Sequence, residues 1–199
     1  MPFIAPIVEG QGEGEAVPIL LHRLAVHTGV LQTMGEPLVI NPPIRVKATS
    51  FLKFDTDFMK HVALAAAKAK GRQGSVLIMM DCEDDCPGRL GPQILARAQG
   101  VRGDVPYLVV LAYREFETWF VTAVNSLQGH FGIPLDLVPP PNPESRRGAK
   151  EWLGTYMTDG YDPIIHQHRL TRVFDIEEAK ANQSFRRLCD RLPALLTQS

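Results

Sequence analysis

Cysteine is scarce in this sequence and follows no framework pattern. The three cysteines, Cys82, Cys86 and Cys189, are odd in number and lack the spacing of a disulfide-stabilised scaffold. Such usage is typical of proteins in a reducing compartment. Cys82 and Cys86 have no second Cys or His pair at ligand spacing, which leaves a structural zinc site as a minor alternative.

Long apolar runs and an excess of one charge are also missing. No stretch approaches the roughly 18 apolar residues of a membrane span, and no basic leader precedes Phe3, so we expect a cytoplasmic protein without a membrane anchor. The 21 basic and 22 acidic residues nearly cancel. The net charge therefore gives no general attraction to nucleic acid or an anionic membrane, and any polyanion must be bound by a local cluster.

The sequence does contain a repeated alternation of strand and helix patterns. Its 199 residues, 45% of them hydrophobic, suit one domain with a sizeable core. Strands are predicted at 3–8, 44–49, 75–80 and 107–112, and helices from about 18 to 29, 57 to 71, 87 to 98 and 114 to 127. This order predicts an α/β fold with an open, mainly parallel sheet flanked by helices, of Rossmann-like type, with right-handed crossovers.

The last third of the chain carries few strand signals. Residues 129–143 are rich in proline and are predicted to form a surface connection. Helical patterns follow at 150–157 and 185–196. We therefore expect an α/β core over 1–128, and a proline-rich connection with a C-terminal helical extension over 129–199, packed on the same domain.

Acidic residues follow two of the predicted strands. Glu9 and Glu13 come after the first strand, and Asp81, Glu83, Asp84 and Asp85 come after the third. The carboxyl ends of parallel strands meet at one edge, where ligands bind. Clustered carboxylates repel one another and a divalent cation relieves the repulsion, so this edge predicts a Mg²⁺ or Mn²⁺ site suited to phosphate chemistry. For Asp84 or Asp85 taken singly, capping the helix near Pro87 is the simpler interpretation.

Three other phosphate-handling classes fit less well. Residues 76–83 resemble a Walker B strand, but the sequence contains no P-loop, so this chain is not itself a P-loop ATPase. A haloacid-dehalogenase-type phosphatase needs paired aspartates after the first strand, where this sequence has Glu9. The early Glu-Gly-x-x-Glu turn is not the pattern of a phospho-receiver domain. Both remain minor alternatives.

Two sets of motifs carry a family resemblance. The turn Glu9-Gly10-Gln11-Gly12-Glu13, with Asp81-Cys82-Glu83 after a later buried strand, resembles the Toprim fold shared by topoisomerases, primases and the overcoming-lysogenization-defect (OLD) nucleases. Over most of the chain, the segments 45–47, 114–119 and 184–188 make the sequence similar to an uncharacterised bacterial family, domain of unknown function 4276.

The Toprim resemblance implies roles for particular carboxylates. Glu9 would be the acid/base or a metal-proximal carboxylate, and Asp81 and Glu83 would hold the cation. Glu13 and Glu117 would complete a nuclease-type site. Glu83 stands where the Toprim pattern usually has a second aspartate. A glutamate keeps the negative charge but moves the carboxylate oxygens by one methylene. For Glu117, an exposed carboxylate in a first helical turn is an equal alternative.

The leading functional hypothesis is a metal-dependent phosphodiesterase or nuclease acting on nucleic acid. Its metal ligands would come from Glu9, Glu13, Asp81, Glu83 and Asp85. Transition-state charge also favours a protein cation, for which Lys47, Lys53 and Lys150 are candidates and Lys150 is preferred. The basic clusters at 146–150 or 166–172 would bind the substrate, although a solvated surface is the simpler interpretation of each. A zinc site formed by His166 and His168 is a minor alternative.

Partners follow from the resemblance alone. OLD-type nucleases work with an ATPase module that is absent here, which implies an ATPase partner encoded separately. The alternative hypothesis is a non-catalytic, Toprim-like partner or regulatory subunit. The near-neutral charge and the short basic clusters favour this alternative modestly. Metal binding through Asp81 and Glu83 separates the two hypotheses, because only an intact site would bind the ion.

Overall fold

The protein is built on one parallel β-sheet, seen in a computed structural model that describes residues 1–197. The main strands are β1 (Phe3–Val8), β4 (Ser75–Asp81) and β5 (Tyr107–Ala112), which pair in that order. Two short strands, β2 (Val39–Ile40) and β3 (Ile44–Arg45), pair with the other edge of β1. All pairings are parallel, which confirms the α/β class and the parallel sheet expected from the sequence.

β2 and β3 pair one after the other with the same edge of β1, so together they act as a single edge strand with a break in it. Asn41 and Val46 donate backbone hydrogen bonds to Ile4 and Val8 on either side of the break. Between them lie Pro42 and Pro43, which have no N–H group to donate to the ladder. The predicted strand 44–49 is therefore only two residues long, and a helix that the sequence analysis missed, α3 (Ala48–Lys53), follows it.

The strand order reverses direction at β1. From β1 the chain passes first to β2 and β3 on one side, and then returns to β4 on the other. In open α/β sheets, such a switch point leaves a crevice beyond the carboxyl ends of the two strands, and ligands bind there. In this protein the switch lies between β1, which is followed by Glu9, and β4, which ends at Asp81.

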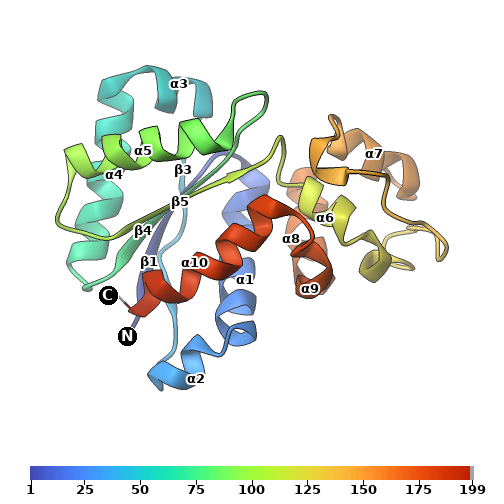
Figure 1. Cartoon of the computed structure of the whole chain (residues 1–199), viewed down its shortest axis with the longest axis horizontal. Helices are drawn as coiled ribbons and strands as arrows, with labels where there is room; N and C mark the ends of the chain where they lie inside the picture. The colour runs from blue at the N-terminus through green and yellow to red at the C-terminus, as the bar shows by residue number, and fades with distance from the viewer. Residues whose placement is uncertain (198–199) are drawn as a thin grey trace.

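Two layers of helices cover the sheet (Figure 1). On one face lie α1 (Gln11–His27) and the C-terminal helix α10 (Gln183–Thr197), and on the other lie α3, α4 (Asp55–Lys70) and α5 (Pro87–Val101). Strand residues alternate between the two cores: Ile4 and Leu77 join the α1/α10 core, and Ile7 and Ile78 join the other. The buried continuous strand patterns of the sequence reflect this double covering.

Helix α1 begins earlier than the sequence suggested. It starts at Gln11 rather than near Pro18, and Pro18 lies inside it. Its first turn therefore follows Glu9 and Gly10 without a connecting loop. As a result Glu13 is a buried first-turn residue rather than part of a flexible turn.

The remaining short elements form a group beside the carboxyl end of the sheet (Figure 1). They are α6 (Thr118–Thr122), α7 (Ala149–Tyr156), a π-helical turn (Pro163–Gln167), α8 (His168–Val173) and α9 (Ile176–Ala179). Two 3₁₀ turns, Val124–Leu127 and Pro143–Ser145, lie in the same part of the chain, while α2 (Val30–Met34) follows α1. Phe174 and Phe185 from this part of the chain share one hydrophobic cluster with Ile4 and Leu77 of the sheet. The C-terminal part thus contributes to the same core as the sheet. No helix within residues 1–197 is both long and apolar enough to cross a membrane.

Candidate functional site

The turn after β1 is shaped by two glycines. A Cβ atom at Gly10 would lie 2.0 Å from Oε2 of Glu13, and one at Gly12 would lie 2.0 Å from Oε1 of Gln167 and 2.7 Å from the backbone oxygen of Pro163. The turn from Glu9 to Glu13 can therefore lie directly against side chains of the acidic site and against the π-helical turn. This explains the glycines of the motif by close approach rather than by flexibility.

Asp81 ends the central strand β4 and is held in one orientation. Its side chain is 9% exposed, and its Oδ1 accepts a hydrogen bond of 2.8 Å from the backbone N–H of Phe116. Its Oδ2 lies 3.7 Å from Nζ of Lys150. One carboxylate oxygen is thus fixed by the chain after β5, while the other faces the centre of the site.

Glu117 precedes α6 and is fully buried, with an exposed fraction of 0%. Its Oε1 accepts hydrogen bonds from the Tyr161 hydroxyl at 2.8 Å and from Nε2 of Gln167 at 3.5 Å. Its Oε2 has no hydrogen-bond partner and lies 3.7 Å from Nζ of Lys150. The alternative of an exposed first-turn carboxylate is therefore wrong.

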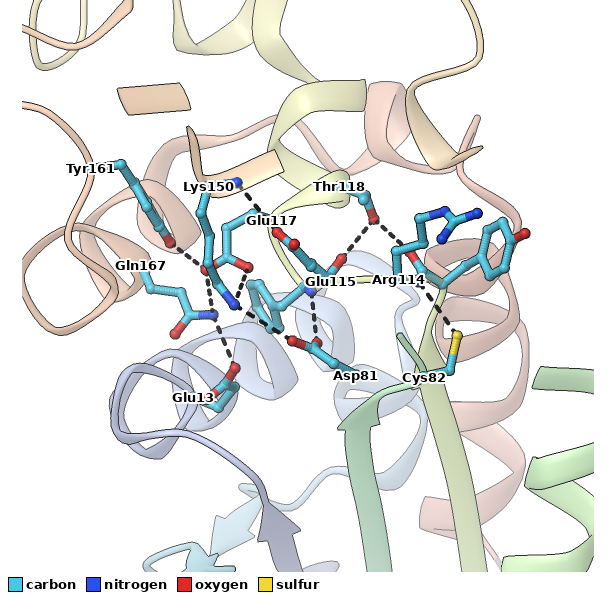
Figure 2. A network of polar contacts seen from close by, with 12 residues as sticks. Glu13, Asp81, Cys82, Arg114, Glu115, Glu117, Thr118, Lys150, Tyr161 and Gln167 are labelled. Atoms are coloured by element: carbon cyan, nitrogen blue, oxygen red, sulfur yellow. Dashed lines mark hydrogen bonds and ion pairs between the residues drawn. The ribbon is translucent and has the colours of Figure 1, made fainter. Parts of the chain in front are cut away.

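Lys150, in the first turn of α7, points its ammonium group between Asp81 and Glu117 (Figure 2). Gln167 contacts Oε1 of Glu117 through its Nε2, which also lies 3.4 Å from Oε1 of Glu13 (Figure 2). Side chains from β4, α1, α7, the segment before α6 and the π-helical turn therefore converge on one point. These segments are far apart in the sequence and meet beyond the carboxyl ends of β1 and β4.

Burial dominates the electrostatics of this cluster. It raises the pKa of Asp81 well above the ordinary value, and the neighbouring Glu117 adds to the effect. Burial likewise raises the pKa of Glu117 to about 7, and raises that of Glu9, where Glu13 and Glu83 contribute further. Burial lowers the pKa of Lys150, but the carboxylates of Glu117 and Asp81 raise it by more, so its ammonium group stays charged at neutral pH.

These shifts predict that the metal-free protein loses stability as pH rises. The pKa of Glu117 is raised from 4.5 to about 7, so its contribution to stability is complete below pH 4.5 and is lost as pH rises through 7. At 1.36 kcal/mol per pKa unit, the loss is on the order of 3 kcal/mol. Urea unfolding in EDTA at pH 5 and pH 8 should show this loss in wild type and a smaller one in Glu117→Gln, which keeps an acceptor for Tyr161. If the free energy of unfolding depended equally on pH in both proteins, the loss could not come from the raised pKa of Glu117.

The predicted ligands after β4 do not all lie together. Glu83 is exposed and adopts a left-handed backbone conformation with φ of 48°, yet it lies near enough to Glu9 to raise that pKa. Asp85 instead lines a separate cleft of about 550 Å³, none of whose lining residues belongs to the cluster around Lys150. Asp84 does not act as the expected helix cap. It pairs with Arg114 and Arg147, and the N-cap position of α5 is Cys86.

The other basic candidates lie outside the cluster. Lys47 and Lys53 are exposed at the two ends of α3, and within residues 1–197 neither forms an ion pair with an acidic side chain. His166 is buried and stacks on Tyr161, whereas His168 faces Glu15 at 3.4 Å. The two histidines therefore do not converge as a zinc pair.

Tyr161 and Gln167 are site residues that the sequence analysis missed. The Asp162 side chain accepts backbone hydrogen bonds from Ile164 and Ile165, and this cap starts the π-helical turn that ends at Gln167. Such turns are rare and often mark functional sites. The Asp162-Pro163 pair signals the start of a helix, but no sequence periodicity relates Gln167 to Glu13 or Glu117, which are 154 and 50 residues away.

The donor chemistry of the cluster suits a hard divalent cation. The free acceptors of the cluster are oxygens, and three buried ones have no hydrogen-bond partner: Oε2 of Glu9, Oε2 of Glu117 and Oε1 of Gln167. Within residues 1–197, however, no three His, Cys, Asp or Glu side chains converge at metal-binding geometry. Magnesium and manganese commonly take only one or two protein carboxylates and complete their shell with water and substrate phosphate. Asp81 and Glu117 would hold such an ion, with Glu9, Glu13 and Glu83 nearby.

Fold and site together define a class of protein: an open parallel α/β domain with a buried acidic site at its topological switch point. Residues 8–193 match the family model described as Domain of unknown function (DUF4276), and the chain belongs to that family. No curated protein and no solved structure matches the chain.

Proposed function

We propose that this protein is a divalent-metal-dependent phosphodiesterase of Toprim type that cleaves nucleic acid. One observation carries the proposal: Glu13, Asp81 and Glu117 are buried beside Lys150 at the carboxyl ends of β1 and β4. Burying several carboxylates together costs stability, and the raised pKa values of Asp81 and Glu117 express that cost. Clusters that are costly in this way are concentrated at functional sites.

The residues divide into roles by their contacts. Asp81 and Glu117 each turn one oxygen toward the centre of the site, while their other oxygen is held by Phe116 or Tyr161. When bound, Mg²⁺ or Mn²⁺ would polarise the phosphate and lower the pKa of a water molecule. Glu9, whose pKa is raised by burial and by Glu13, is suited to accept a proton from that water more readily than an ordinary glutamate would.

Lys150 supplies positive charge from the protein. Phosphodiester cleavage gathers negative charge on the phosphate oxygens, and a fixed cation beside them lowers the barrier. Arg146 and Arg147 precede Lys150 and are exposed, so they are placed to hold the substrate backbone on the same side of the molecule. With a net charge of −1, the protein depends on such local groups for binding a polyanion.

The Toprim assignment and an ATPase partner belong to the proposal and rest on resemblance. Glu9 and Glu13 around the first strand turn, with Asp81 and Glu83 after a later strand, follow the Toprim order in this chain. In the OLD-type nucleases of that fold an ATPase accompanies the nuclease. A separately encoded ATPase is therefore the proposed partner.

The test is a cleavage assay on a panel of substrates. Purified protein is incubated with supercoiled DNA, single-stranded DNA and RNA in Mn²⁺ or Mg²⁺, beside an EDTA control and the Asp81→Ala variant. We expect metal-dependent cleavage of at least one substrate, lost in EDTA and in the variant. No cleavage of any substrate, by the protein alone or together with a candidate ATPase partner, would contradict the proposal and favour a non-catalytic partner or regulatory subunit.

A further inference from the structure

The acidic site already contains a cation, which is the ammonium group of Lys150. Its Nζ lies 3.7 Å from Oδ2 of Asp81, at the end of β4, and 3.7 Å from Oε2 of Glu117, directly before α6 (Figure 2). Both oxygens belong to side chains whose other oxygen is hydrogen-bonded within the protein. The two oxygens that face Lys150 are therefore those left free to bind a metal ion.

The contact is looser than a hydrogen-bonded ion pair. Charge-assisted N–H···O bonds are about 2.7–2.9 Å long, whereas Lys150 is 3.7 Å from each oxygen, and Oε2 of the fully buried Glu117 has no hydrogen-bond partner. The ammonium group thus compensates the charge of the carboxylates without satisfying their hydrogen bonding. A small divalent ion at about 2.0–2.1 Å from oxygen would satisfy both.

Lys150 also has a route out of the site. Its side chain is 37% exposed, whereas those of Asp81 and Glu117 are 9% and 0% exposed. It is the second residue of α7 and follows an exposed stretch that contains Arg146 and Arg147. The lysine can swing toward solvent, while the two carboxylates are fixed by their partners.

We propose that Lys150 is the resident cation of the metal-free site and that a divalent ion displaces it, so that metal binding and the Lys150 contact exclude one another. The inference rests on the proposed function, because it concerns how the same site takes up its ion. It explains why no three acidic side chains within residues 1–197 are gathered at metal-binding distances while the lysine lies among them. Displacement also moves a positive charge to the surface where a phosphate would arrive.

The test is direct Mn²⁺ titration, by calorimetry or by the spin resonance of free Mn²⁺, without nucleic acid. If Lys150 competes with the ion, Lys150→Met should bind Mn²⁺ at least about tenfold more tightly than wild type, a change of 1.4 kcal/mol. Lys150→Arg, which keeps the charge, should stay near wild type, and Lys53→Met is the control for loss of a lysine elsewhere. Equal or weaker binding by Lys150→Met would overturn the inference.

A second measurement uses wild type alone, in case Lys150→Met folds poorly. Lysine acetylation by a water-soluble reagent is followed by mass spectrometry with and without Mg²⁺, and Lys53 serves as the internal reference. Displacement should make Lys150 several-fold more reactive when the ion is present, and unchanged reactivity would contradict it. If the protein cleaves nucleic acid but Lys150 does not compete with the ion, only this inference is contradicted. If Lys150 competes with the ion but no nucleic acid is cleaved, only the proposed nuclease activity is contradicted.

Discussion

Asp81→Asn is expected to abolish metal-dependent cleavage while leaving the fold intact. Asparagine has the shape of aspartate and keeps an oxygen that can accept the 2.8 Å hydrogen bond from Phe116. It removes the charge that faces Lys150 and the proposed ion. Because a bound metal contributes several kcal/mol to transition-state stabilisation, we expect the rate to fall by about a thousandfold or more.

The same substitution should not lower stability at neutral pH. Burial raises the pKa of Asp81 well above its ordinary value, which means that the charged form of this side chain is less favourable in the folded protein than in the unfolded chain. Asparagine is neutral at every pH, so its free energy of unfolding in EDTA should equal or exceed that of wild type at pH 8. Asp84→Asn is the matched control, since Asp84 is exposed and pairs with Arg114 outside the cluster. Full activity in Asp81→Asn, or equal losses in both variants, would contradict the role of Asp81.

Gly12→Ala is expected to cause the largest loss of stability among single-methyl changes in the first helix. The new Cβ would lie 2.0 Å from Oε1 of Gln167 and 2.7 Å from the backbone oxygen of Pro163. The Gln167 side chain can move, but a backbone oxygen in the π-helical turn cannot move without shifting that turn. Overpacking of this kind costs about 1–3 kcal/mol, and moving Gln167 also removes its contacts with Glu13 and Glu117.

Gly14→Ala, two residues further along the same helix, is the matched control. Its Cβ would meet only the Arg45 side chain, at 3.5 Å and 3.9 Å, which is ordinary contact. Alanine should therefore stabilise the helix there by up to about 1 kcal/mol. In thermal unfolding, the midpoint temperature should therefore be lower than that of wild type for Gly12→Ala and higher for Gly14→Ala. If both variants were stabilised to the same extent, this result would contradict the close packing of α1 against the π-helical turn.

The sheet could be predicted because its strands are buried on both faces. Residues 76–80 form a continuous apolar run that is followed by an aspartate, and β4 occupies 75–81. The same reasoning placed Glu9 and Asp81 at strand ends, and these ends are neighbours because β1 pairs with β4 in parallel. Local pattern therefore places Glu9 and Asp81 at the same edge of the sheet, but it does not show that Glu117 joins them there.

The rest of the site depends on contacts that are distant in the sequence. Lys150 is 69 residues from Asp81 (150 minus 81), and the helix that carries it follows a proline-rich connection with no periodic signal. Nothing in the sequence around Glu117 shows that Tyr161 and Gln167 would cover it. Burial is a property of tertiary packing, and for that reason the sequence alone equally allows Glu117 to be an exposed carboxylate.

The loop after β4 shows a second limit of sequence reasoning. Residues 83–85 are all acidic and adjacent, yet their side chains face different surroundings: Glu83 lies near Glu9, Asp84 pairs with Arg114, and Asp85 lines the separate cleft. The left-handed conformation of Glu83 turns the chain at this point. Non-glycine residues adopt that conformation uncommonly, so composition alone does not reveal the turn.

The most direct measurement of the central claim is Mn²⁺ binding to wild type and Asp81→Asn in the absence of substrate. We expect one class of Mn²⁺ site in wild type at neutral pH, and an affinity at least about tenfold weaker in the variant, because the charge that faces the ion is lost. Asp84→Asn should bind as wild type does. Unchanged Mn²⁺ affinity in Asp81→Asn would contradict the account, since the buried carboxylates at the ends of β1 and β4 would then not be the site of the metal ion.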